Sequence, residues 1–225
     1  MKKHHTAAMA AAILASALLG TAARADEATN AASRPVSKSG IPYLADDRVG
    51  PPDLVDAIRA RRPGGNLLNL DRMLLYSPNY AKAWNGLFAA IRGQLSLAPR
   101  LRELAIMAIG SLNHADYEWA QHEGEFLKAG GTKEQLAALK KDVAAASRNA
   151  NLFDESERAA LALTSEMTRN IAVTPTTMKR VRAALPDQQT VELVGTVAGY
   201  NMVSRFVVAL GVEVEDPPTA TTSTR

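Results

Sequence analysis

The stretch LAPRLRELAIMAIGSLNHADYEWAQHEGEFLKAGG, residues 97–131, decides the fold of this chain. Pro99 suits a first helical turn, and apolar residues follow it at helical spacing, beginning with Leu101 and Leu104. A second helix is expected from about Ala115 to Ala129, where two glycines provide the usual C-terminal stop. These two helices also carry most of the polar side chains that are capable of chemistry.

The same periodicity extends outward from this stretch and predicts an all-α bundle of about eight to nine helices. Capping boxes at Thr132/Gln135 and Asp154/Glu157 mark two further helix starts. No convincing strand pattern is present. The last helix, 187–210, is apolar over most of its circumference, which indicates burial in the core or against another subunit. The helices expected elsewhere cover 53–63, 67–76, 80–94, a segment from 132, 154–170 and a segment from 174.

The N-terminus has the pattern of a secretory signal peptide. Lys2 and Lys3 precede an apolar run over 7–19, and a small-x-small site ends at Ala25. The run is shorter than the roughly 20 residues that a spanning helix needs. We therefore expect cleavage after Ala25 and export, with the periplasm as the expected location. No other segment is expected to span a bilayer.

The remaining chain divides into three expected parts. Residues 26–50 are rich in Ser, Ala, Pro and Asp and are expected to form a flexible or surface-hugging arm. Residues 51–214 form the helical domain. Residues 215–225 are expected to be a disordered tail, with the chain untied from about Val212 onward.

The charge balance gives no case for binding to nucleic acid. The sequence has 26 basic and 23 acidic residues, a formal net charge of +3. The leader holds Lys2, Lys3 and Arg24 and no acidic residue, so its removal leaves a balanced chain. The cluster of Arg59, Arg61 and Arg62 is typical of a solvated helix face.

The chain contains no cysteine. This excludes disulfides, lipoprotein anchoring, thiol redox chemistry and Cys-ligated metals. Any chemistry must therefore use carboxylate and imidazole groups.

Only two histidines remain after the leader, His114 and His122. Glu118 and His122 are spaced i, i+4, so their side chains share one helix face. A carboxylate one turn from an imidazole can orient its tautomer and raise its pKa, as general acid–base catalysis requires. The same spacing also suits a plain structural hydrogen bond, and both interpretations stay open here.

A metal site is the next alternative, because His114, Glu118 and His122 fall on one stripe. The two histidines are about 12 Å apart along the helix axis, too far to share an ion. His114 is expected beside Asn113 as part of the helix cap. No metal is predicted, although Glu118, His122 and Glu103 remain a conceivable ligand set.

Several of these segments together resemble a known protein family. The segment 97–106, followed by Glu118-Trp119-Ala120-Gln121-His122 and Ala129-Gly130, resembles the carboxymuconolactone decarboxylase and AhpD-like family. The stretch 193–210 is similar to the closing helix of many members. The resemblance covers about Leu67 to Val214 and implies an AhpD-like helical bundle and a homo-oligomer, a trimer or hexamer.

In the peroxidase branch of this family, a Glu is followed by a Cys-x-x-Cys-x-x-x-His motif. Glu103 and His122 match that pattern, whereas Ala115 and Glu118 stand at the two Cys positions. Peroxiredoxin-type activity is therefore not expected, because it needs a thiolate. The decarboxylase branch resembles this chain in lacking the Cys pair and in placing a Glu four positions before its His. That resemblance implies no metal and no organic cofactor.

The resulting hypothesis is a pocket floored by the last helix, in which Glu103, Glu118 and His122 converge. His122, held by Glu118, would donate a proton after decarboxylation of a small carboxylated lactone or related acid, and Glu103 would tune or relay.

Other side chains are expected around this pocket. Arg205 is expected to bind a substrate carboxylate through its planar fork, or else to form a salt bridge to Glu118 or Glu103. Tyr117 and Tyr200 are expected to line the pocket or to belong to the core. The alternative function is a non-catalytic member that binds a ligand or assembles.

Overall fold

The computed structural model describes residues 35–215. The expected signal peptide, residues 26–34 of the expected arm and residues 216–225 of the expected tail lie outside this range. Within it the chain is all-α, with ten α-helices and one short 3-10 helix and no strand element. The helices are α2 (Pro52–Arg59), η1 (Pro63–Gly65), α3 (Asn69–Leu74), α4 (Pro78–Gly93), α5 (Pro99–Leu112), α6 (Asp116–Lys128), α7 (Lys133–Lys141), α8 (Val143–Ala146), α9 (Glu155–Asn170), α10 (Pro175–Ala184) and α11 (Asp187–Leu210).

Local capping chemistry explains where several helices begin. The Thr132 hydroxyl accepts from the backbone N–H of Gln135 at 3.2 Å, and the Asp154 carboxylate accepts from that of Glu157 at 2.8 Å. Both capping boxes that the sequence predicts are therefore formed. The four-residue helix α8, which begins at the Asp142 cap, brings the number of α-helices above the eight to nine expected.

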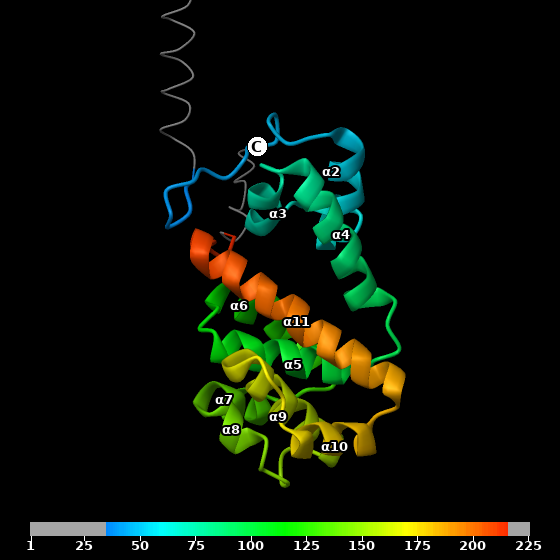
Figure 1. The fold of residues 1–225 in the computed structure, drawn as a ribbon. Helices are drawn as coiled ribbons and strands as arrows, with labels where there is room; N and C mark the ends of the chain where they lie inside the picture. The colour runs from blue at the N-terminus through cyan, green and yellow to red at the C-terminus, as the bar shows by residue number, and fades with distance from the viewer. Residues whose placement is uncertain (1–34, 216–225) are drawn as a thin grey trace, which may run out of the picture.

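Helix α5 lies at the centre of the core. Its residues from Leu104 to Ile109 are completely inaccessible to solvent, and the helix packs against α6, α9 and α11. In Figure 1, α11 runs diagonally across the molecule, with α2, α3 and α4 on one side and α5 to α10 on the other. The candidate site lies between these two groups.

Helix α11 is the most apolar of these elements. Within residues 35–215, it alone matches a membrane span by length and composition, although the sequence analysis expects no such segment. In this molecule α11 packs against α4, α5, α6, α9 and α10, and 44% of its most apolar window is buried. Its role as a core helix accounts for its composition.

The two ends of the described chain lie against each other. The backbone N–H of Lys38 donates to Gly211 O at 3.0 Å, and that of Glu213 donates to the hydroxyl of the buried Tyr43 at 2.9 Å. Val212 is buried as well. The expectation that the chain is untied from Val212 onward is therefore wrong for residues 212–215, because these contacts return them to the domain after α11 ends at the left-handed Gly211.

The contribution of the Asp154 cap to the stability of α9 can be tested by substitution. Asp154→Ala is expected to lower the free energy of unfolding by about 1 kcal/mol, because α9 loses the acceptor for its first-turn N–H groups. Asp154→Ser, which keeps an acceptor, should stay close to wild type. Urea unfolding followed by circular dichroism measures the difference, and equal stability of the two variants would contradict the assigned role of the cap.

Candidate active site

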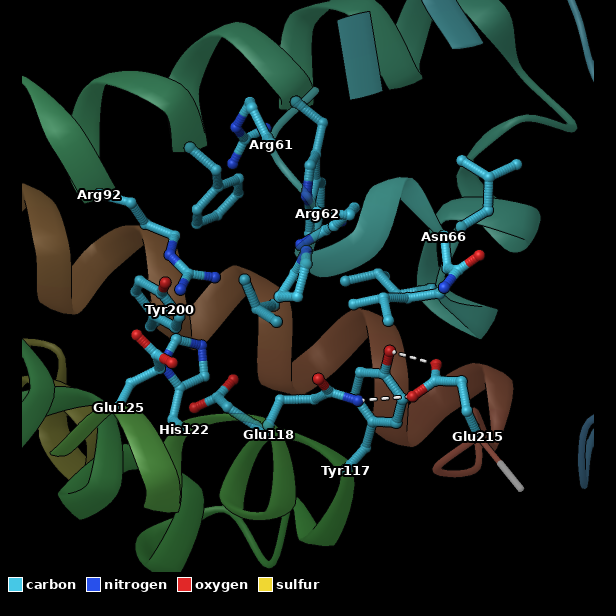
Figure 2. A pocket seen from close by; sticks show the side chains of 18 of the residues that line it. Arg61, Arg62, Asn66, Arg92, Tyr117, Glu118, His122, Glu125, Tyr200 and Glu215 are labelled. Carbon is cyan, nitrogen blue, oxygen red and sulfur yellow. Dashed lines mark hydrogen bonds between the residues drawn. The ribbon is translucent and has the colours of Figure 1, made fainter. Parts of the chain in front are cut away.

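A pocket of about 800 Å³ opens between the two groups of helices. Its floor is formed by α6 and α11, and its roof by the end of α2, the following turn and α4, as Figure 2 shows. Polar and charged side chains gather on both surfaces, while aromatic rings fill one side. The polar and aromatic residues that line the pocket include Arg61, Arg62, Arg92, Tyr117, Glu118, Gln121, His122, Tyr200 and Glu215.

The central contact of the site joins α5 to α6. His122 Nδ1 lies 2.8 Å from Glu103 Oε2, and both side chains are buried, with Glu103 only 1% exposed. The other oxygen of Glu103 accepts from Arg102 Nε at 3.1 Å. Glu103 therefore lies between an imidazole and a guanidinium, while His122 also lines the pocket.

The pKa shifts of this pair indicate its protonation state. Burial raises the pKa of Glu103, but the hydrogen bond from His122 and the charge of Arg102 act against it, and the net shift is below the ordinary value of 4.5. Burial lowers the pKa of His122 below its ordinary 6.5, although Glu103 opposes that shift. At neutral pH we therefore assign an ionised Glu103 that accepts from Nδ1–H of a neutral His122, which leaves Nε2 as a basic lone pair.

Glu118 has a different partner from the one expected. Its Oε2 accepts from the Ser204 hydroxyl of α11 at 3.0 Å, and no hydrogen bond joins Glu118 to His122 within residues 35–215. The expected hydrogen bond between Glu118 and His122 is therefore not formed. Both side chains leave α6 on the pocket side, but Glu103 on the neighbouring helix holds the imidazole nitrogen instead.

The surroundings of Glu118 favour its protonated, neutral form. Its side chain is buried, and its Oε1 has no hydrogen-bond partner within the described part of the chain. Burial raises the pKa of Glu118 well above its ordinary value of 4.5, with only the Ser204 hydroxyl acting in the opposite direction. A protonated carboxyl group at this point can donate a hydrogen bond or a proton to a molecule in the pocket.

Three arginines, which the sequence analysis did not assign to the site, face it from the roof. Arg62 forms two hydrogen bonds to Asp71 at 2.8 and 2.5 Å, so its charge is compensated. Arg61 binds the backbone and side-chain oxygens of the neutral Asn85, and no ion pair of Arg92 is found within residues 35–215. Burial, followed by repulsion from Arg62 and Arg92, lowers the pKa of Arg61, as expected of a cationic site suited to an anion.

Tyr117 and Tyr200 both line the pocket, as one of the two interpretations expected. The Tyr200 ring packs edge-on against the His122 ring, with 5.1 Å between centroids, and fixes the plane of the imidazole. The Tyr117 hydroxyl donates to Glu215 at 3.0 Å. Burial raises the pKa of both phenols, so both remain protonated donors.

Arg205 is not placed where the sequence analysis expects it. Its exposed guanidinium donates to the backbone and side-chain oxygens of Asn201 at 2.9 and 2.8 Å, and it does not line this pocket. Since Ser204 faces Glu118, the next residue is turned about 100° around the helix and away from the site. Neither a carboxylate-binding role in this pocket nor the alternative salt bridge to Glu118 or Glu103 is formed.

The remaining histidine lies elsewhere. His114 has a left-handed backbone (φ 52°) and lines a second hollow with Lys140, Lys141 and Arg169. It lies at the helix boundary beside Asn113, as expected, between the C-cap of α5 at Asn113 and the N-cap of α6 at Ala115. Among residues 35–215 no group of three His, Asp or Glu side chains is arranged to hold a metal ion, so the conceivable set of Glu103, Glu118 and His122 is not formed.

Comparison with known proteins agrees with this architecture. Residues 78–166 match the model of the carboxymuconolactone decarboxylase family. No curated protein matches the chain in sequence.

Solved structures share the fold over most of the chain. The alkylhydroperoxidase AhpD core protein from Ralstonia eutropha JMP134, a peroxidase-related protein, has a TM-score of 0.68 at 15% identity and covers 82% of this chain and 95% of its own. The debrominase Bmp8 variant in complex with 2,3,4-tribromopyrrole has a TM-score of 0.64 at 19% identity, with coverages of 76% and 89%. A peroxidase-related protein from Silicibacter sp. TM1040 has a TM-score of 0.59 at 16% identity, with coverages of 67% and 78%.

At these identities the likeness to the solved structures concerns the fold. The family assignment comes from the matched segment, which contains both Glu103 and His122. Over residues 78–166 the chain thus carries the domain of the carboxymuconolactone decarboxylase family, in a form without cysteine and within an AhpD-like helical fold.

Proposed function

We propose that this protein is a cofactor-free acid–base lyase that decarboxylates a small carboxylated lactone or a related organic acid. One observation carries the proposal: an imidazole held by a buried carboxylate and a second buried carboxyl group with one unpartnered oxygen line the same pocket of about 800 Å³. A cavity beside His122 favours a catalytic role over the alternative of a purely structural histidine.

The two pKa shifts make the acid and the base available at the same pH. With ordinary values of 4.5 and 6.5, Glu118 would lose its proton before His122 did, and no pH would favour a neutral acid together with a neutral base. Burial raises the pKa of Glu118 and lowers that of His122, which favours the state with a neutral acid and a neutral base. Proton donation and proton acceptance can then occur in one pocket without a metal.

The reaction can be written with these groups alone. The C–C bond to the substrate carboxylate breaks, its carboxylate carbon and both oxygens leave as CO₂, and the bonding electron pair moves into the unsaturated lactone. Glu118 transfers its proton to the resulting carbanion or enolate and becomes a carboxylate. A proton from water, passed through His122, restores Glu118, so that the net change is one proton consumed and one CO₂ released. This revises the sequence-based role of His122 as direct donor, because burial favours its neutral form, although Glu103 opposes that shift.

The roof arginines supply the electrostatic part of the proposal. Arg92 and Arg61 are the cations that line the pocket without an ion-pair partner in the described part of the chain. They would attract an anionic substrate, and Arg92 faces the end of the pocket that contains His122 and Tyr200 (Figure 2).

The names of the structural relatives suggest two other reactions, hydroperoxide reduction and debromination. Peroxiredoxin-type reduction needs a thiolate nucleophile, and the chain has no cysteine. We therefore do not propose thiol peroxidase activity for this protein, and no feature of the pocket favours a halogenated substrate.

The acid–base groups are tested by substitution. Glu118→Gln and His122→Ala are each expected to lower kcat for decarboxylation of a carboxylated lactone by about 10²–10⁴-fold, the usual contribution of general acid–base catalysis. His114→Ala is the matched control, because that histidine lies at the second hollow. Release of CO₂ is the measurement. Unchanged turnover in both variants would contradict the assignment, as would the absence of turnover by wild type with any acid or lactone.

The arginines are tested by comparing KM values. Arg92→Gln is expected to raise KM by roughly tenfold or more, because a charge-assisted hydrogen bond contributes about 1.5–3 kcal/mol. Arg205→Gln should leave KM unchanged, since Arg205 binds Asn201 outside the pocket. Steady-state kinetics decides between them, and an effect confined to Arg205 would restore the role that the sequence suggests.

The pH dependence of kcat/KM follows from the direction of the shifts. Activity is expected to fall at acidic pH as His122 becomes protonated, with a midpoint below its ordinary 6.5. It should also fall at alkaline pH as Glu118 ionises, with a midpoint well above its ordinary 4.5. Glu118→Gln should abolish the alkaline limb in the residual activity. An acid limb above pH 6.5 in wild type would contradict a neutral, buried His122.

A further inference from the structure

The segment that follows α11 reaches the rim of the candidate site. Gly211 adopts a left-handed conformation that turns the chain back, and Lys38 lies where a side chain at position 211 would stand. Residues 212–215, which we name the C-terminal strap, then run along the domain. Val212 is buried, and the carbonyl of Glu213 accepts from Asn69 Nδ2 at 3.0 Å. The strap is therefore anchored at its start, and its far end is Glu215.

The carboxylate of Glu215 fills a set of three donors at the pocket. Oε1 accepts from the Tyr117 hydroxyl at 3.0 Å and from the backbone N–H of Asn69 at 2.6 Å, and Oε2 accepts from Gln121 Nε2 at 2.6 Å. Tyr117, Gln121 and Glu215 all line the pocket. No cation is among the three donors, so Glu215 is held by hydrogen bonds from neutral groups alone.

The Glu215 contact and the proposed acid–base groups lie in different parts of the pocket. Figure 2 shows Glu215 beyond Tyr117, at the opposite side of the pocket from Arg92 and His122, with Glu118 between them. The pocket thus has a cationic end and a second end whose donors already hold a carboxylate. An organic anion that extends from one end to the other must compete with Glu215 for these donors.

We propose that the C-terminal strap is an intramolecular competitor, in which the Glu215 carboxylate occupies a carboxylate subsite formed by Tyr117, Gln121 and the Asn69 amide and leaves it when a ligand carboxylate binds there. The proposal deepens the proposed function, because it concerns regulation of the same pocket, but it depends only on anion binding and not on turnover. Opening the strap removes one negative charge from the pocket and exposes three donors. Closing it restores both features.

The test measures binding of glutarate, which carries two carboxylates, and of benzoate, which carries one, by titration calorimetry of the full chain. Glu215→Ala is expected to tighten glutarate binding by about tenfold, the gain expected if the strap fills the subsite about 90% of the time. Benzoate should gain much less, because the cationic end already accepts its single carboxylate. Glu213→Gln is the matched control, since Glu213 lies on the same strap and its side chain forms an exposed ion pair with Lys38 outside the pocket. Glutarate binding that is unchanged or weaker in Glu215→Ala overturns the proposal.

A second measurement follows hydrogen exchange at single amides. The Asn69 amide hydrogen bonds directly to Glu215, so its hydrogen exchange reports release of the strap. In Glu215→Ala the Asn69 amide loses its acceptor and should exchange faster than in wild type, and saturating glutarate should slow it again. The Glu213 amide, which donates to Tyr43, should stay protected throughout. Exchange at Asn69 in Glu215→Ala that glutarate does not slow overturns the proposal. Loss of turnover in His122→Ala with this response intact would separate the strap from the catalytic assignment.

Discussion

The 2.8 Å hydrogen bond between His122 and Glu103 joins the two helices on which the fold and the candidate site both depend. It lies in a region where burial alone would make an ionised carboxylate costly, and Arg102 on the other oxygen offsets that cost. Because α5 is the most deeply buried helix, the pair cannot move without disturbing its contacts with α9 and α11. The imidazole is thus fixed both by the core and by the edge of Tyr200.

Much of this architecture could be predicted from the sequence, because it follows local rules. Pro99 and the two capping boxes fix helix starts through backbone chemistry that a single chain segment contains. His122 was identified from its i, i+4 spacing to Glu118, and Glu103 from the family resemblance. Their direct pairing was not, since an i, i+4 interval favours Glu118 on the same helix and the contact across helices depends on how α5 packs against α6.

The parts that could not be predicted arise from tertiary contacts. Arg61 and Arg92 are typical surface arginines in sequence, and only the position of α2 and α4 over α6 turns them toward the pocket. Glu215 is the first residue of the segment that is expected to be a disordered tail, yet three donors from distant segments hold it. Arg205 shows the reverse case, because one residue of helical rotation removes a suitable side chain from the site.

The proposed acid–base groups and part of the pocket lining have different origins in the chain. Glu103, Glu118 and His122 lie within the segment that matches the family, residues 78–166, whereas Arg61, Arg62 and Glu215 lie outside it. Arg92 lies inside the matched segment, so only part of the proposed ligand selection is encoded outside it. Exchanging the flanking residues 52–66 for those of a relative would therefore replace Arg61 and Arg62 and leave Glu103, Glu118 and His122 in place.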